Sequence, residues 1–301
     1  MSDRATALAI LRDTPLALRE STLNAWCQAL AADTIGASRL EARTPAATKR
    51  TPTGNIGSFG FFGPVFHRPN FLSFLFGGTS IIEARRMLSE LVDDSRVETI
   101  LIEFDTPGGG VDGLIEFAAE LREARQKKPI IGFINTMACS AGHWLAAQST
   151  ELIITPSGDT GSVGVFMVHG DVSQMNERIG YKPTYIGTPR YKADGNPDTP
   201  LSDDTRKYLQ SQVERVYEQF VADIVRGRGR GLTAETVRKT FGEGRTVDAA
   251  QAVQRKMVDR VVAFPSEALT YAGSVGKRYQ TQAAQADADY IAYGIRIAER
   301  L

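Results

Sequence analysis

Two side chains that could act as nucleophiles stand next to each other in NTMACSAGHWLA, residues 135–146. Cys139 and Ser140 lie where the apolar segment PIIGFI gives way to small residues that favour a helix. Neighbouring residues on an extended segment point to opposite faces, so only one of the pair can face a given site. Ser140 is the stronger candidate, because cysteine is more often a small buried hydrophobic residue. The alternative role of Ser140 is to cap the following helix.

A serine nucleophile needs a base that removes its proton. Among three histidines, His143 falls in the helix after the serine and is expected to point away from it, and His67 precedes a proline-containing loop. His169, at the end of the expected strand SVGVFMV, is the only credible histidine base. A lysine can also serve once burial and neighbours remove its proton. Lys192, in the loop GTPRYKADGNPDTPLS (residues 187–202), is therefore the second alternative.

Three consecutive glycines follow another apolar strand, in LIEFDTPGGG (residues 101–110). Such a turn lets the backbone approach a ligand closely, and a helix after it presents free N–H groups. The spacing does not match a phosphate-binding fingerprint. The residues alone leave two roles open, an ordinary strand-to-helix turn and a cradle for a reacting group.

Short apolar strands alternating with amphipathic helices must position these residues. The expected strands are NIGSFGF, ETILIEF, PIIGFI, ELIIT and SVGVFMV. A helix is expected over SIIEARRMLSELVDD, which opens with Ser80 and Glu83 at capping-box spacing, and another from about Ser202 to Arg226. This alternation predicts an α/β domain.

Composition divides the chain into three parts. Residues 1–54 are expected to form a small helical N-terminal arm and a linker rich in Pro, Thr and Ala. Residues 55–265 hold the α/β domain, and residues 266–301 form a polar, Ala-rich helical tail. The apolar stretch RPNFLSFLFGGTS (68–80) either folds into the core or lines a peptide groove or subunit contact.

The overall composition bounds the class of protein. The 301 residues are 42% hydrophobic with a formal net charge of zero, so we expect a soluble globular protein and no nucleic-acid partner. Two cysteines without disulfide or metal-ligand spacing favour a reducing, cytoplasmic setting, and no metal or cofactor is expected. Arg12, Asp13 and Pro15 interrupt the first apolar stretch, so neither a signal peptide nor a membrane span is expected.

Four motifs taken together carry a resemblance: FDTPGGG, ACSAGHWLA, DTGSVGV and YKADGNP. In this order and at these separations they resemble the signal peptide peptidase A (protease IV) family of serine proteases, over roughly residues 56–265. The likeness is greatest for the phage branch of capsid-assembly and head-maturation proteases, the lambda protein C type. It implies the Clp protease/crotonase-like fold of repeated ββα units, with a Ser/Lys protease domain at residues 55–265.

The resemblance assigns roles residue by residue. Ser140 would be the nucleophile and Lys192 the general base of a Ser/Lys dyad. The further site residues it implies are the oxyanion-hole donors Gly109, with Gly108 as a neighbouring candidate, and Ala141, and the base-orienting Ser162.

The function implied is that of a serine endopeptidase that cleaves scaffold and capsid proteins during phage head assembly, in the bacterial cytoplasm and the prohead interior. Duplicated family members carry the lysine in one repeat and the serine in the next. A chain with a single repeat is then expected to form a homo-oligomer, a ring whose dyad is shared between neighbouring protomers. Two alternatives remain open, a non-catalytic capsid-assembly scaffold module on the same fold and a Clp-like Ser/His protease that uses His169.

Overall fold

The computed structural model describes residues 15–19, 21–23, 25, 55–69, 73 and 77–298. Its strands are β1 (Leu16–Leu18), β2 (Ile56–Phe62), β3 (Val65–Phe66), β4 (Thr79–Ser80), β5 (Thr99–Thr106), β6 (Gly108–Gly110), β7 (Ile130–Cys139), β8 (Glu151–Ile154), β9 (Asp159–Gly161), β10 (Thr246–Asp248) and β11 (Arg260–Val261). Its helices are α4 (Ile81–Asp93), α5 (Leu114–Lys127), α6 (Ala141–Ala146), α7 (Ser173–Arg178), α8 (Asp203–Arg228), α9 (Ala234–Thr240), α10 (Ala249–Gln254) and α11 (Pro265–Ala298).

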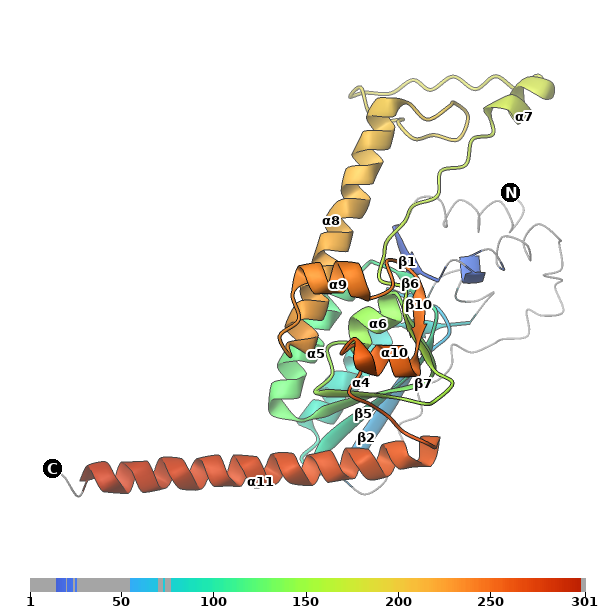
Figure 1. Ribbon diagram of the computed structural model, residues 1–301. Coiled ribbons are helices and arrows are strands. Elements are labelled where there is room, and N and C mark those ends of the chain that lie inside the picture. Colours follow the sequence, from blue (N-terminus) through green and yellow to red (C-terminus); the bar gives the residue numbers. More distant parts are fainter. Residues whose placement is uncertain are drawn as a thin grey trace.

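A largely parallel sheet forms the centre of the molecule (Figure 1). Its order is β10-β9-β7-β5-β2, in which β10 pairs antiparallel with β9, while β8 pairs with the first half of β7 and with β11. The expected strands over NIGSFGF, ETILIEF, PIIGFI and ELIIT are confirmed as β2, β5, β7 and β8. β5 begins with the buried run TILI and β7 with the buried run IIGFI, the usual pattern for parallel strands covered on both faces.

A smaller sheet, of order β1-β6-β3-β4, lies against the first. Twice the chain leaves the large sheet, adds a short strand to the small one and then enters a helix. The first unit runs through β2, β3, β4 and α4, and the second through β5, β6 and α5. This repetition confirms the expected fold class of ββα units.

Helices cover both faces of the large sheet. On one face Phe61 and Phe104 stack with their ring centroids 5.4 Å apart, and Phe117 of α5 tilts against Phe61 at 6.1 Å. On the other face the first turns of α11 bury Ala268, Ala272 and Val275 against the sheet. The start of the expected 266–301 tail is thus part of the core.

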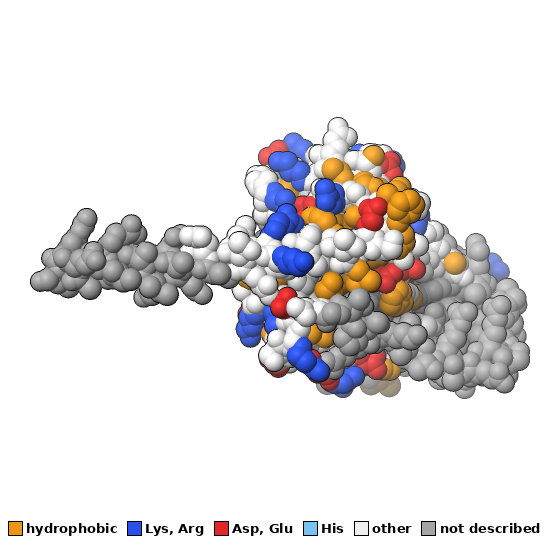
Figure 2. Space-filling model, turned by 90° about the horizontal axis from the view of Figure 1, so that it is seen from below, with side chains coloured by type: hydrophobic (Ala, Val, Ile, Leu, Met, Phe, Trp, Pro, Cys, Tyr) orange, Lys and Arg blue, Asp and Glu red, His pale blue; other side chains and the backbone are white. Residues whose placement is uncertain are grey.

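Beyond these turns α11 extends past the sheet (Figure 1). Within the described ranges, no helix combines the length and apolarity needed to cross a bilayer. The face seen in Figure 2 carries basic and acidic side chains interspersed with apolar ones.

The structure corrects one expectation about the N-terminal arm, most of which lies outside the described residues. Leu16–Leu18 were expected to be helical but form β1, because the backbone of this segment pairs with the glycine strand β6. Residues 21–23 and 25 are helical.

Two further local expectations are wrong. SVGVFMV (162–168) does not form a regular strand, because positive φ angles at Gly161 (105°) and Ser162 (51°) turn the chain out of β9. One isolated bridge, from Phe166 to Leu16, is the remaining pairing described in this segment. Ser80 makes no capping bond to α4, because its hydroxyl donates instead to the His67 carbonyl, 3.4 Å away.

Candidate active site

Ser140 lies at the carboxyl end of β7, in the turn that leads into α6. Its φ of 53° and ψ of −115° are unusual for a residue with a side chain, and such strain is often found at functional positions. Its backbone N–H donates to Gly161 O (2.7 Å) and its Oγ lies 3.4 Å from Gly164 O. Among the described residues the hydroxyl makes no capping bond to α6, so the structure does not show the alternative role of Ser140 as a helix cap.

Cys139 lies on the other side of the same turn and is fully buried. Burial raises the pKa of its thiol to about 12, so the thiol stays protonated and unreactive at neutral pH. The structure therefore supports Ser140, rather than Cys139, as the nucleophile of the pair.

The glycine strand β6 lies directly beside Ser140. A Cβ placed on Gly108 would come within 3.0 Å of Ser140 Cβ and 2.9 Å of Cys139 O, and its φ is 102°. A Cβ on Gly109 would overlap Val65 O at 1.9 Å. Both positions therefore require glycine, because a side chain would push β6 away from β1 and Ser140 at Gly108 and away from β3 at Gly109.

Thr106, a residue that the sequence analysis missed, shapes this turn. It is fully buried and its Oγ1 accepts the Gly108 N–H at 3.2 Å. Because this bond occupies the Gly108 N–H, Gly109 is the better candidate of the two expected glycine donors of the oxyanion hole. Ala141 is the first residue of α6, where a backbone N–H has no partner within the helix. The sequence signal that could have identified Thr106 is its position, since it is a polar residue at the end of an apolar strand, directly before Pro-Gly.

Ser162 lies in the segment that wraps the other side of Ser140. The carbonyls of Gly161 and Gly164, which flank it, both accept bonds from Ser140. Its N–H donates to Arg245 O at 2.9 Å, which fixes the positive φ at this position. The structure thus brings the expected residues together around Ser140, with Gly108, Gly109, Ala141 and Ser162 from three different segments.

Lys192 is not part of this cluster within one chain. It lies exposed in the loop between α7 and α8, and no hydrogen bond joins it to Ser140 in the described chain. Figure 1 shows this loop at the far end of α8 from α6. We name residues 171–209, which include α7, this loop and the first turns of α8, the Lys192 arm.

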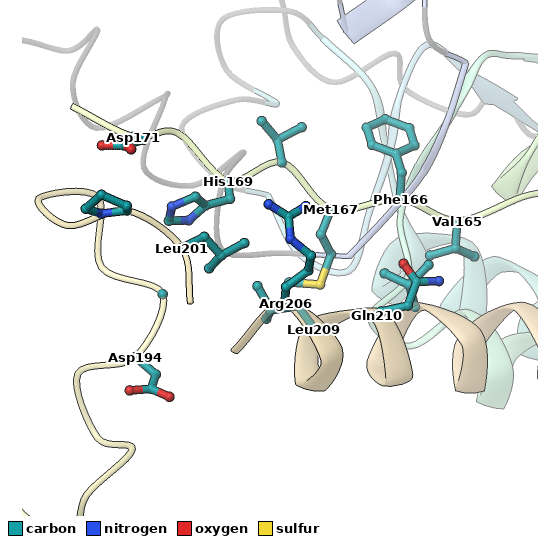
Figure 3. A pocket seen from close by; sticks show the side chains of 14 residues that line it. Val165, Phe166, Met167, His169, Asp171, Asp194, Leu201, Arg206, Leu209 and Gln210 are labelled. Atoms are coloured by element: carbon teal, nitrogen blue, oxygen red, sulfur yellow. The ribbon is translucent and has the colours of Figure 1, made fainter. Parts of the chain in front are cut away.

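His169 lies on the wall of a cavity of about 800 Å³ between residues 165–171, the loop after Asp194 and the first turns of α8. Figure 3 shows the chain passing from Val165 to His169 along this wall without folding back. Val165 follows the Gly164 carbonyl that Ser140 contacts, so His169 is carried away from the serine. The described structure gives no contact between them.

His143 performs a structural task in α6. It is fully buried, its Nδ1 lies 2.8 Å from Thr160 Oγ1, and its ring meets Phe241 edge-on at 6.0 Å. Burial, aided by the charge of Arg228, lowers its pKa to about 3. His143 therefore remains neutral and links α6 to β9 through Thr160.

Helix α8 anchors α6 from behind. Trp144 stacks on Phe220 with centroids 4.3 Å apart, and its Nε1 donates to Asp223 Oδ2 at 3.0 Å. Asp223 is fully buried and also pairs with Arg122 (3.0 Å) and Arg226 (2.8 Å). This clamp fixes the helix whose first N–H lies next to Ser140.

Comparison with known proteins identifies the family of this chain. The model of a family described as Peptidase family S49 matches residues 122–272, which include Ser140, Ser162 and Lys192. The chain belongs to peptidase family S49. Among solved structures, a variant of a membrane-bound stomatin-specific protease shares 14% identity with a TM-score of 0.44, covering 73% of this chain and 85% of its own.

Two curated relatives of this S49 protein come from phages. It is 33% identical over 175 residues to capsid assembly protease C of Escherichia phage lambda, which covers 58% of this chain and 39% of the relative. It is 27% identical over 194 residues to head-tail preconnector protein GP5 of Enterobacteria phage P21 (64% and 38%). A putative signal peptide peptidase SppA of Enterococcus faecium is 28% identical over 175 residues (58% and 50%). The chain thus spans half or less of these relatives.

Proposed function

We propose that this S49 protein is a serine endopeptidase with Ser140 as its nucleophile. The observation that carries the proposal is the strained turn that holds Ser140 against a glycine strand in which only glycine fits at Gly108 and Gly109. The Gly109 and Ala141 N–H groups are the proposed oxyanion-hole donors. Donors of this kind each contribute about 10²–10³ in rate.

The proposed base is Lys192 of a neighbouring copy. The Lys192 arm is ordered by its own contacts, such as Val172 N to Pro197 O (2.8 Å) and Asn176 Nδ2 to Asp198 Oδ1 (2.7 Å). Yet the arm exposes seven large apolar or aromatic side chains: Met175, Ile179, Tyr181, Tyr185, Ile186, Tyr191 and Tyr208. Exposed apolar surface of this extent usually marks a contact with another protein. Within the described part of one chain, Lys192 has no contact with Ser140. A second copy docked on the arm would bring Lys192 toward the Ser140 of that second copy.

The proposed reaction is acyl transfer in two steps. Ser140 Oγ attacks the scissile carbonyl carbon while its proton passes to the Lys192 amine, and the negative oxygen faces Gly109 and Ala141. The tetrahedral intermediate expels the amine product, which takes the proton from Lys192. Water, deprotonated by the same lysine, then attacks the acyl-serine and releases the second product and Ser140.

The proposed substrates are proteins of a phage head. Two relatives are named for capsid assembly and for the head-tail preconnector. Cleavage of scaffold or capsid proteins within the prohead is the corresponding proposal for this chain. Mass spectrometry of head proteins processed with the natural chain and with Ser140→Ala would identify the sites, and identical peptides from both would reject it.

A labelling experiment tests the chemistry. A fluorophosphonate should modify Ser140 of the assembled protein, and Ser140→Ala should lose both labelling and peptide hydrolysis. Lys192→Ala removes the proposed base, and Lys192→Arg replaces it with a guanidinium, which is never deprotonated at working pH. Each should therefore lower activity by at least about 10³-fold. His169→Ala is the matched control and should stay active. Collapse of activity in His169→Ala alone would favour the Ser/His alternative, and no labelling of an assembled sample would favour the non-catalytic scaffold module.

A further inference from the structure

Strand β1 occupies the edge of the glycine strand β6 beside Ser140. It runs antiparallel along β6, with Leu16 opposite Gly110, Ala17 opposite Gly109 and Leu18 opposite Gly108. The next residue continues the pairing, because Arg19 N donates to Pro107 O at 2.8 Å. An extended peptide added to the edge of a sheet is a common way in which proteins hold a peptide ligand.

The opposite edge of β1 is also paired. Leu16 N donates to Phe166 O (2.9 Å) and Leu16 O accepts from Phe166 N (3.1 Å). Phe166 lies two residues beyond Gly164, whose carbonyl Ser140 contacts. Residues 16–18 therefore lie between two backbone segments, β6 and the segment at Phe166, and both segments continue to residues that lie beside the candidate nucleophile.

The pairing places one carbonyl against the glycine strand, at the position that adjoins the serine. Because Leu16 turns its polar groups toward Phe166, Ala17 turns its own to β6, where it faces Gly109, the proposed oxyanion-hole donor. A Cβ placed on Gly108 would lie 2.3 Å from the Ala17 carbonyl oxygen and 3.0 Å from Ser140 Cβ, so both atoms lie close to Gly108. With β1 in place, Ser140 is only 1% exposed.

We propose that residues 15–19 are an internal pseudosubstrate, bound in the peptide groove of the proposed protease and excluding other peptides from Ser140. The inference rests on the proposed function, since it takes the groove beside Ser140 as the substrate groove. A substrate must displace β1 before it reaches the serine.

The buried side chains of β1 also define the substrate class. Leu16, Ala17 and Leu18 are 5%, 0% and 3% exposed. The methyl group of Ala17 is enclosed next to the nucleophile, so a larger side chain there would have to displace its surroundings. The groove should accept extended segments in which a small residue stands between two aliphatic ones.

The test is a binding measurement in full-length Ser140→Ala, which needs no catalysis. A fluorescein-labelled peptide Pro-Leu-Ala-Leu-Arg, copied from residues 15–19, is titrated and followed by polarisation. Adding Ala17→Arg should expel β1 and lower the apparent dissociation constant by about tenfold or more, because a tethered competitor acts at millimolar effective concentration. Ser21→Arg, which also introduces an arginine but at an exposed position nearby, should leave the apparent dissociation constant unchanged. A peptide with Phe in place of Ala should not bind.

Equal peptide affinity with and without Ala17→Arg would overturn the proposal. Hydrogen exchange in Ser140→Ala without the second substitution gives an independent answer, should Ala17→Arg fail to fold. Saturating peptide should speed exchange of the Leu16 amide, whereas an amide that stays protected makes β1 a permanent structural strand. Peptide binding without any hydrolysis by the unmutated chain would contradict the proposed function alone. Hydrolysis with β1 still protected would contradict the pseudosubstrate alone.

Discussion

At the scale of single residues, two adjacent nucleophiles differ because the turn after β7 gives them different surroundings. Cys139 is buried with a pKa raised to about 12, whereas Ser140 occupies the strained position beside β6. We expect iodoacetamide to leave Cys139 unmodified in the folded Cys27→Ser chain for hours at pH 8 and to modify it once urea is added. Peptide mass mapping measures this. Rapid modification of the folded chain would contradict the burial of the thiol.

His143 gives the stability of the protein an acid-sensitive component. Its pKa is about 3 in the folded chain and near 6.5 when unfolded, so below pH 6.5 the unfolded state takes up a proton that the folded state does not. The resulting loss of unfolding free energy is about 1.4 kcal/mol per pH unit between pH 6.5 and 3. Urea unfolding of the natural chain and of His143→Gln at several pH values should show a shallower dependence in the variant. Equal slopes would assign the acid sensitivity to other groups.

Sequence reasoning at this scale succeeded where chemistry and backbone geometry restrict the residue type. Gly108 and Gly109 stood out because a glycine run after a strand permits close approach, and the structure places Gly108 beside Ser140 and Gly109 against the backbone of Val65, while their role as oxyanion-hole donors remains a proposal. Thr106 was missed because its role depends on one hydrogen bond to Gly108 that folding creates. The resemblance, rather than any local property, singled out Lys192, and its role as the base remains a proposal.

At the scale of elements, the clamp between α6 and α8 should carry measurable stability. Asp223→Ala removes the shared partner of Trp144, Arg122 and Arg226, and leaves the buried indole N–H unpaired. We expect a loss of about 3–5 kcal/mol in the free energy of unfolding, as for other broken buried ion pairs. Chemical denaturation measures this loss.

The matched control lies on the same helix. Glu218 pairs with Arg238 at the surface, with their side chains 58% and 39% exposed. Glu218→Ala should change the free energy of unfolding by about 0–1 kcal/mol. Similar effects at positions 218 and 223 would show that Asp223 does not organise the clamp.

Elements with long apolar runs were predictable, and those determined by tertiary pairing were not. β5 and β7 followed from ETILIEF and PIIGFI because burial on both faces requires such runs. SVGVFMV is similarly rich in apolar residues, yet the left-handed backbone at Gly161 and Ser162 redirects it past Ser140. β1 escaped notice because its three residues gain strand structure only from β6 and Phe166.

At the scale of the whole molecule, a shared dyad predicts complementation between inactive variants. Mixed Ser140→Ala and Lys192→Ala chains should recover about a quarter of the natural activity after subunit exchange, since one interface in four then joins an intact serine to an intact lysine. Peptide hydrolysis by the mixture measures this. Verified mixed oligomers without recovery would place the dyad within one chain.

The Lys192 arm permits a test of assembly that spares the fold. Ile186 is 97% exposed, so Ile186→Asp should leave the melting temperature of the isolated chain unchanged. If the arm docks on a neighbour, the same change should shift the protein toward monomers in sedimentation and abolish hydrolysis. Ser211→Asp, an exposed position outside the arm, is the control. Active oligomers of Ile186→Asp would exclude this part of the arm from the interface.

The glycine run has a consequence for how the sequence can drift. A side chain at Gly108 or Gly109 would overlap neighbouring backbone, but a Cβ at Gly110 meets no atom within 4 Å. Three glycines that look equivalent in the sequence are therefore under unequal selection. Mutational drift should preserve the first two glycines and accept small residues at the third, so that variation at position 110 alone is compatible with an intact site.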